Sequence, residues 1–321
     1  MPMNKNDKGY IDLIIPILAS TLFIVIFIVS AFFPIKKIDE NALVSIIPTL
    51  IATPSPTLSA TPTIIPTTTP TTSATVKATR APTPVPIINN VPPGAGYSRQ
   101  SVKTDSGTFT ISLIAADIGS TRVIVDTAST SDCSSNCPAL SLSDYVSRNG
   151  GFAGVNGTYF CPKDYSTCVG KENSFDLLVM NKDKYYFNSG NNVYSTNPAV
   201  IFGSGYIRFV SAASQWGRDT GVNGVIMNYP LLVFNGNISF GGDGDPKKGS
   251  KGSRSFVASR GNTVYIGVVH SATVAESAIA LKALGMDNAM NLDNGGSTAL
   301  WYGGYKVGPG RAIPNAIIFT K

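Results

Sequence analysis

The chain has 321 residues, with 25 Lys and Arg against 19 Asp and Glu, and a formal net charge of +6. This charge is compatible with an anionic ligand. The chain carries no concentrated basic tract and no interleaving of basic with aromatic residues, so we expect no nucleic-acid partner. Composition divides the chain into an apolar N-terminal segment, a Thr/Pro-rich segment and a globular C-terminal part.

After a short tail (residues 1–12), residues 13–35 form an apolar run without a single charge. A helix of this length reaches roughly 34 Å, enough to cross a hydrocarbon core of about 30 Å. Val29-Ser30-Ala31 resembles the cleavage site of a signal peptide, but the run is longer than the usual apolar region of one. We therefore expect an uncleaved transmembrane anchor, with a cleaved signal peptide as the alternative.

Residues 36–95 contain a tract, 51–84, that is dominated by Thr and Pro. Such a composition cannot bury a core, and its prolines favour extended polyproline II over helix. We expect a disordered stalk that lifts a domain at 96–321 off a membrane. Lysines flank both ends of the 13–35 run, so charge alone does not set its orientation. The stalk and the cysteines favour a single-pass cell-membrane protein whose C-terminal domain is extracellular.

The four cysteines of the chain all lie within the C-terminal domain, at positions 133, 137, 161 and 168. An even number of clustered cysteines behind a membrane segment predicts two disulfides. Local pairing, Cys133 with Cys137 and Cys161 with Cys168, is our expectation among three possible connectivities. A zinc site with four thiolates is the alternative, but the spacings C-x3-C and C-x6-C fit zinc ribbons poorly. We expect no metal and no cofactor.

Strand patterns dominate residues 96–321, which are enough for one large domain. Residues 107–118 and 121–128 alternate in the manner of strands and are predicted to form a hairpin. Residues 141–151 read as a short capped helix, and 273–286 as a longer one that begins with the capping box Thr273-Val-Ala-Glu276. The predicted fold is an α+β domain, with a mixed, mainly antiparallel sheet and a few short helices, behind an N-terminal transmembrane helix.

The segment "NLDNGGSTAL" (291–300) sets one carboxylate, Asp293, beside Gly295, Gly296 and Ser297. Asn-Gly between two apolar runs is a strong hairpin signal, because both residues tolerate a positive φ. A tight turn is therefore one interpretation and the wall of an active site is the other.

Two further places carry groups suited to ligand binding. Asn156, Gly157 and Tyr159 stand at a strand end, where a glycine allows close approach to the backbone and an asparagine both donates and accepts. An ordinary strand-end turn is the alternative. Arg254 enters an apolar strand, where a lone guanidinium needs a partner such as a carboxylate or a phosphate.

Near the end of the chain, His270 closes an apolar strand, and Arg311 and Asn315 precede the last strand. His270 is the only histidine, and a structural role is the alternative to a catalytic one. A serine hydrolase built on Ser297 and His270 is disfavoured, because the nucleophile elbow G-x-S-x-G needs a glycine where this chain has Ala299.

The segments "NGTYF", "RSFVA", "NLDNGGSTAL" and "RAIPNAIIF" occur in this order between residues 156 and 319. Together they resemble the motifs of the phosphodiester glycosidase family, which includes the lysosomal uncovering enzyme, and the resemblance covers roughly residues 100–321. Two positions depart from the usual pattern. Asn294 replaces the first of three glycines, and His270-Ser271 stands where the family often has an acidic residue followed by glycine.

The resemblance implies hydrolysis of a glycosyl-1-phosphodiester at the anomeric carbon, releasing the sugar and leaving a phosphomonoester. Arginines suit this chemistry because they stabilise a phosphate leaving group, and a carboxylate can stabilise or attack an oxocarbenium-like carbon or activate water. The implied catalytic residues are Asp293, Arg254 and His270. The implied substrate-binding residues are Asn156, Gly157, Tyr159, Gly295, Gly296, Ser297, Arg311 and Asn315.

The expected substrate is a carbohydrate phosphodiester of cell-surface or extracellular polysaccharide. A non-catalytic module that binds anionic surface polysaccharide would use the same arginines. Only the enzyme needs an ionised Asp293 beside the anomeric carbon.

Overall fold

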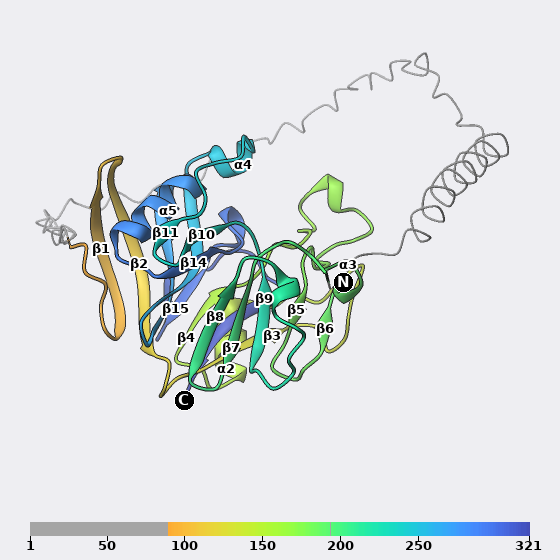
Figure 1. Ribbon diagram of the computed structural model, residues 1–321. Coiled ribbons are helices and arrows are strands. Elements are labelled where there is room, and N and C mark those ends of the chain that lie inside the picture. Colours follow the sequence, from red (N-terminus) through yellow and green to blue (C-terminus); the bar gives the residue numbers. More distant parts are fainter. Residues whose placement is uncertain (1–88, 193) are drawn as a thin grey trace, which may run out of the picture. The chain divides into compact units, whose positions relative to one another are not determined.

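The computed structural model describes residues 89–192 and 194–321 (Figure 1). The expected tail, the expected anchor at 13–35 and the expected stalk up to residue 88 lie outside these residues. Within the described part of the chain, no helix is long and apolar enough to cross a membrane. The described residues belong to a single unit, residues 79–321.

The largest sheet has seven strands in the order β1-β2-β13-β12-β14-β10-β11. Its strands are β1 (Gly96–Thr104), β2 (Gly107–Asp117), β13 (Thr263–Ala272), β12 (Gly252–Arg260), β14 (Asn288–Asn291), β10 (Leu231–Phe234) and β11 (Asn237–Ile238). Asn89, which we expected to belong to the stalk, donates its N–H to the carbonyl oxygen of Ser101 at 2.8 Å. The folded part of the chain therefore begins before Gly96.

Two five-stranded sheets complete the strand framework, in the orders β16-β15-β4-β17-β3 and β6-β5-β9-β7-β8. The first contains β16 (Tyr305–Val307), β15 (Leu300–Tyr302), β4 (Ala153–Asn156), β17 (Asn315–Thr320) and β3 (Arg122–Thr127). The second contains β6 (Tyr186–Phe187), β5 (Val179–Met180), β9 (Gly224–Met227), β7 (Ala199–Gly203) and β8 (Tyr206–Val210). The strand pairings of the described residues are all antiparallel, which confirms the α+β prediction.

The helices of the described residues are short, as expected. They are α2 (Leu142–Arg148), α3 (Ser189–Asn192), α4 (Pro246–Gly249) and α5 (Val274–Ala283), with 3-10 turns η1 (Ser166–Cys168), η2 (Ala213–Gln215) and η3 (Gly295–Ser297). The predicted capping box of α5 is present, because the Thr273 side chain accepts from the Glu276 N–H and the Glu276 carboxylate accepts from the Thr273 N–H. The Glu276 carboxylate thus caps the N-terminus of α5.

The predicted hairpin between residues 107–118 and 121–128 is wrong. Both segments are strands, but β2 pairs with β1 and β13, whereas β3 pairs with β17 in another sheet. Residues 118–121 therefore carry the chain from one sheet to the next. Both strands bury side chains on both faces. The alternation of apolar and polar residues therefore does not show which strand pairs with β2 or with β3.

The main core lies where the three sheets face one another. It draws Ile114 and Ile266 from the seven-stranded sheet, Val155 and Ile317 from the first five-stranded sheet, and Val200 from the second. A second cluster fills the space between the seven-stranded sheet and α5, which lies over one face of that sheet (Figure 1). The sheets are thus buried on the sides that meet, and their strand ends and connecting loops remain free to form a site.

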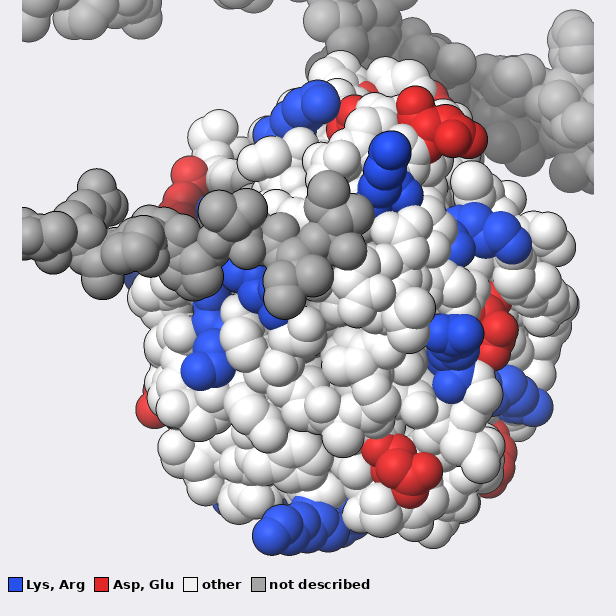
Figure 2. Space-filling model, turned by 90° about the vertical axis from the view of Figure 1, so that its left-hand side faces the viewer, with Lys and Arg blue, Asp and Glu red and all other residues white. Residues whose placement is uncertain are grey.

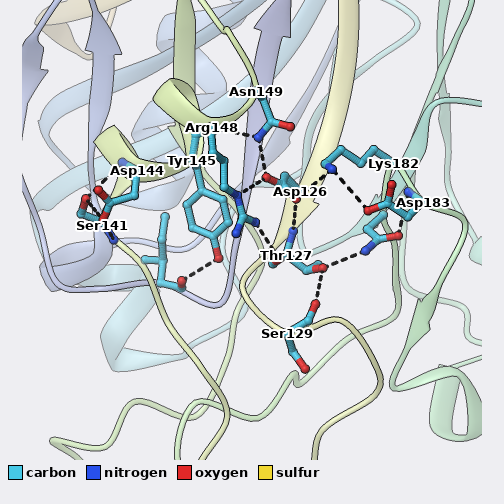
Figure 3. Close-up of polar contacts among 12 residues, drawn as sticks. Asp126, Thr127, Ser129, Ser141, Asp144, Tyr145, Arg148, Asn149, Lys182 and Asp183 are labelled. Carbon is cyan, nitrogen blue, oxygen red and sulfur yellow. Dashed lines mark hydrogen bonds and ion pairs between the residues drawn. The ribbon is translucent and has the colours of Figure 1, made fainter.

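A polar network centred on the buried carboxylate of Asp126 joins α2 to β3 (Figure 3). Arg148, at the end of α2, donates its Nε–H to Asp126 at 2.7 Å and an Nη2–H to the Thr127 carbonyl oxygen at 2.7 Å. Asn149 donates to the same carboxylate at 2.5 Å, and the Lys182 ammonium lies 3.9 Å away. Two cations and an amide therefore compensate a carboxylate that has little access to water.

Charge on the side of the domain formed by β1 is dispersed (Figure 2). In this view Lys and Arg side chains alternate with Asp and Glu, and wide uncharged areas separate them. Charged side chains gather instead in a cleft formed by strand ends and loops.

Candidate active site

A cleft of about 570 Å³ brings together residues from distant parts of the sequence. Its walls come from the segment after β4, the loop after β9, the α4 region with the start of β12, the turn after β14, and the loop before β17. Eight residues singled out from the sequence line this cleft: Tyr159, Cys161, Cys168, Arg254, Asp293, Gly295, Ser297 and Arg311.

The segment 291–300 is a crossing between sheets and not a hairpin. It leaves β14 in the seven-stranded sheet, forms the 3-10 turn η3, and enters β15 in a five-stranded sheet. Gly295 has φ +63°, a conformation that favours glycine. The crossing places Asp293 in the cleft wall, where its main chain is held by neighbours on both sides.

Asn156 supports the Asp293 segment from beneath the cleft. It is fully buried, and its Nδ2 donates to the Asp293 carbonyl oxygen at 2.7 Å. Its Oδ1 accepts from the Ser255 hydroxyl at 2.8 Å and from the Ala299 N–H at 3.1 Å. One side chain therefore connects β4 to β12 and to both ends of the turn that carries Asp293.

Gly157 and Asn315 pack against each other next to this support. The Gly157 carbonyl oxygen accepts from the Asp293 N–H at 2.9 Å, and the Gly157 N–H donates to the Asn315 carbonyl oxygen at 3.1 Å. The Asn315 side chain accepts from the Thr158 N–H at 3.0 Å. Both residues are buried, so the structure places them, with Asn156, as supports of the cleft rather than on its surface.

The carboxyl group of Asp293 is poised to titrate near neutral pH. Its pKa is raised from 3.8 to about 6, chiefly by burial and to a smaller extent by the nearby negative charge of Asp176. Hydrogen bonds from the Ser297 side chain and the Asn294 N–H, with the positive charge of Arg311, act in the opposite direction. The Asn294 N–H lies 2.8 Å from Oδ1.

Arg254 enters the cleft with its positive charge unpaired by any carboxylate of the described residues. Its Nε–H donates to the Ala272 carbonyl oxygen at 2.9 Å, and its Nη2 donates to the carbonyl oxygens of Lys247, at 3.0 Å, and Ser250. These bonds fix the guanidinium and fasten the α4 loop over β12. They leave Nη1 without a hydrogen bond in the described structure.

Arg311 faces Arg254 from another wall of the same cleft. Its N–H donates to the Gly296 carbonyl oxygen at 2.8 Å, and a Cβ atom on Gly296 would overlap its guanidinium. Gly296 is therefore needed for the close approach of Arg311. The nearest carboxylate oxygen of an ion pair, in the exposed Asp164, is 3.9 Å away, a loose contact.

The disulfide Cys161–Cys168 closes a small loop in the cleft wall, and Cys133–Cys137 forms the second bridge. Both predicted pairings are confirmed. The loop carries Tyr165, whose ring lies 5.3 Å from the Arg311 guanidinium and 5.3 Å from the Lys247 ammonium. Tyr165 thus makes cation–π contacts with residues of two other walls of the cleft.

The sequence of residues 149–320 matches the family model of phosphodiester glycosidases. The chain belongs to the phosphodiester glycosidase family. This confirms the resemblance carried by the four sequence motifs. No curated protein matches the chain in sequence.

Solved structures share the fold of this chain at low identity. The zebrafish N-acetylglucosamine-1-phosphodiester alpha-N-acetylglucosaminidase catalytic domain, auto-inhibited by its pro-peptide, is similar with a TM-score of 0.55 and 15% identity over 74% of this chain and 86% of that one. A hypothetical protein from Synechocystis is similar with a TM-score of 0.51 and 13% identity over 70% of this chain. The match spans 62% of the Synechocystis chain, less than two thirds of it.

His270 does not line the cleft. Its Nε2 lies 2.9 Å from the hydroxyl of Ser112, which is fully buried, and it borders a separate shallow pocket beside Ser271 and Lys251. Burial lowers the pKa of His270, and the charge of Arg99 lowers it further. The structure gives it the structural environment that we considered as the alternative.

The cleft residues that the sequence analysis missed include Asp176, Tyr165 and Tyr229. The Tyr229 ring meets Tyr159 edge-on at 5.1 Å between ring centroids, and the Tyr159 hydroxyl accepts from the Asn291 side chain at 2.7 Å. Asp176 is the first residue of the apolar, strand-like run "DLLVM". A single acidic residue at the start of such a run could have indicated a functional carboxylate. Tyr165 and Tyr229 lie in loops, where the sequence offered none.

Proposed function

We propose that this protein hydrolyses a glycosyl-1-phosphodiester at the anomeric carbon, releasing the sugar and leaving a phosphomonoester. The observation that carries the proposal is the convergence of Asp293, Arg254 and Arg311 on one cleft. Neither arginine is held by a close carboxylate in the described structure, so both are available to an anionic substrate. Family membership supports the same reaction class.

The two arginines suit the phosphodiester and its departure. When the bond between the anomeric carbon and the phosphate oxygen breaks, the electron pair moves onto that oxygen and negative charge grows on the phosphate. Guanidinium groups donate charge-assisted, often bidentate hydrogen bonds to such oxygens. Because Arg254 is already fixed by three carbonyl oxygens, it needs little reorganisation when that charge develops.

Asp293 suits the carbon side of the same bond. Its carboxylate must be ionised to stabilise an oxocarbenium-like carbon. The hydrogen bonds from Asn294 and Ser297 and the charge of Arg311 favour the ionised form, whereas burial opposes it. The aromatic rings of Tyr159, Tyr165 and Tyr229 provide apolar surface for the sugar in the same cleft.

We propose further that the substrate belongs to cell-surface or extracellular polysaccharide, and that the protein is a single-pass membrane protein with its C-terminal domain outside. The apolar run at 13–35 and the Thr/Pro-rich tract support this location. The two disulfides also support it, because such bonds persist in oxidising compartments.

The test is incubation of the full-length protein with a panel of α- and β-glycosyl phosphodiesters, followed by phosphorus NMR. We expect a phosphomonoester signal to grow with the wild type and to be lost in Asp293→Asn and Arg254→Ala. Asp105→Asn, in the exposed β1–β2 turn, is the matched control for loss of a carboxylate and should keep full activity.

A wild type that binds members of the panel saturably but releases no phosphomonoester would contradict hydrolysis. It would instead identify a binding module for anionic polysaccharide. In that case Asp293→Asn would leave binding intact, whereas Arg254→Ala would weaken it.

A further inference from the structure

We propose that Asp176 is the second catalytic carboxylate of this cleft, the base that activates the attacking water while Asp293 faces the anomeric carbon. This assignment rests on the proposed function. The sequence analysis identified one carboxylate only, yet glycoside hydrolysis ordinarily uses a pair of acidic side chains.

The backbone around Asp176 is fixed to the cleft wall. Its N–H donates to the Tyr159 carbonyl oxygen at 3.4 Å, and Phe175 forms a β-bridge with Phe160. Phe175 and Leu177 on either side are buried, whereas Asp176 is exposed. In an extended segment, successive side chains point in opposite directions. The two apolar neighbours therefore anchor the segment in the core and direct the carboxylate into the cleft that it lines.

Asp176 is also uncommitted, in contrast to the other carboxylates of the cleft lining. Asp245 caps α4 by accepting from the Lys247 N–H at 2.7 Å and pairs with Lys248 at 3.6 Å. Asp293 is held by the N–H of Asn294. The carboxylate of Asp176 makes no hydrogen bond and no ion pair within the described residues. A group that must accept and release a proton in each turnover needs this freedom.

The electrostatics of the pair agree with this division of labour. Partial desolvation by the surrounding cleft wall raises the pKa of Asp176 although its side chain is open to solvent, and only the charge of Lys171 opposes the rise. The charge of Asp176 in turn raises the pKa of Asp293, so the two carboxyl groups sense each other across the cleft. Asp293 has hydrogen bonds that favour its anion, and Asp176 has none. The environments thus separate a charge-stabilising carboxylate from a proton-transferring one.

The step balances as follows. The water oxygen bonds to the anomeric carbon, and one water proton passes to the Asp176 carboxylate. The bond from that carbon to the phosphate oxygen breaks with its electron pair on oxygen, so a phosphomonoester leaves beside Arg254 and Arg311. Asp176 then releases its proton to solvent, and the cleft returns to its starting state.

The experiment compares wild type, Asp176→Asn and Asp105→Asn on one turned-over phosphodiester, with and without sodium azide. We expect Asp176→Asn to lower kcat about 100- to 10,000-fold with KM changed only a few-fold. Azide attacks without losing a proton, so it should restore turnover of this variant and yield a glycosyl azide. The Asp105→Asn control should match the wild type, and equal melting temperatures would confirm that all three proteins fold.

A variant Asp176→Asn with wild-type kcat and pH profile would overturn the assignment while leaving the hydrolase intact. A loss of kcat that azide does not restore would likewise overturn it, by giving Asp176 a positioning role. A wild type without turnover on the whole panel would remove the proposed function itself, and this assignment with it.

Discussion

Asn156 holds the main chain of Asp293 in place, through a hydrogen bond of 2.7 Å from Nδ2 of the first residue to the carbonyl oxygen of the second. Every polar atom of the Asn156 side chain is thereby engaged, since Oδ1 serves both Ser255 and Ala299. The asparagine of the "NGTYF" motif thus holds the turn that carries Asp293 through its backbone.

Removing this side chain should damage both stability and catalysis. Asn156→Ala leaves the Ser255 hydroxyl and the Ala299 N–H buried without their acceptor, at about 1–3 kcal/mol for each unsatisfied group. We expect the free energy of unfolding to fall by about 2–4 kcal/mol in urea denaturation, and kcat to fall with it. Asn237→Ala, on exposed β11, is the control and should change neither. A stable, fully active Asn156→Ala variant would contradict this role.

Gly157 should tolerate no side chain at all. A Cβ atom there would overlap the Asn315 side chain and approach its carbonyl oxygen to 2.9 Å. Since both partners are buried, Gly157→Ala should lower the free energy of unfolding by about 1–3 kcal/mol, as overpacking does. Gly94→Ala is the matched control, because nothing lies within 4 Å of its Cβ position. Thermal unfolding of the two variants measures the difference, and equal melting temperatures would refute the packing argument.

Gly296 should respond to the same substitution in the opposite manner. A Cβ atom there would overlap the Arg311 guanidinium, which is the mobile end of a long side chain and can move away. Gly296→Ala should therefore keep the melting temperature within a few degrees of the wild type but raise KM for the phosphodiester, because Arg311 is displaced. Initial-rate kinetics measure this effect. An unchanged KM would show that the position of Arg311 does not matter for binding.

Local sequence patterns were sufficient to predict those features that are determined by residues close together in the chain. The caps of α2 and α5 and the disulfide loops follow from neighbouring residues, and these predictions are confirmed. The pairing partners of β2 and β3 depend on which sheet buries which face, and that is decided by residues far along the chain.

The candidate site shows the same limit. The motifs placed Asp293, Arg254 and Arg311 in one cleft, but they did not separate residues that line it from residues that support it. Asn156, Gly157 and Asn315 are buried at strand ends, and His270 lies on β13, next to β12, but contacts Ser112 of β2 instead of the cleft. Whether a strand-end residue lines the cleft or is buried beside it depends on how its strand is oriented and paired in the sheet, and the sequence motifs do not specify this.

The network around Asp126 should contribute to stability and not to catalysis. Asp126→Asn leaves the Arg148 guanidinium and Lys182 without their shared carboxylate. Breaking a fully buried pair costs about 3–5 kcal/mol, and partial exposure of Arg148 reduces this to about 2–3 kcal/mol. Asp183→Asn, which removes an exposed partner of Lys182, should cost less than about 1 kcal/mol. Urea denaturation checks both values, and kcat on the phosphodiester should be unchanged in the two variants.

Asp293 should make the folded protein less stable above pH 6 than it would be without this charge. Its pKa in the folded state, about 6, lies above its ordinary value of 3.8, so the folded state holds the proton more tightly than the unfolded one. By linkage, the ionised group costs nothing below about pH 4, and its cost grows between pH 4 and 6 and is complete above pH 6. The difference between these pKa values sets an upper limit of about 3 kcal/mol. Asp293→Asn should therefore melt at a higher temperature than the wild type at pH 8 and at the same temperature near pH 3.5, although we expect it to lose activity. A variant that is less stable than the wild type at pH 8 would show that the hydrogen bonds and Arg311 outweigh burial, and that the carboxylate is stabilised in its place.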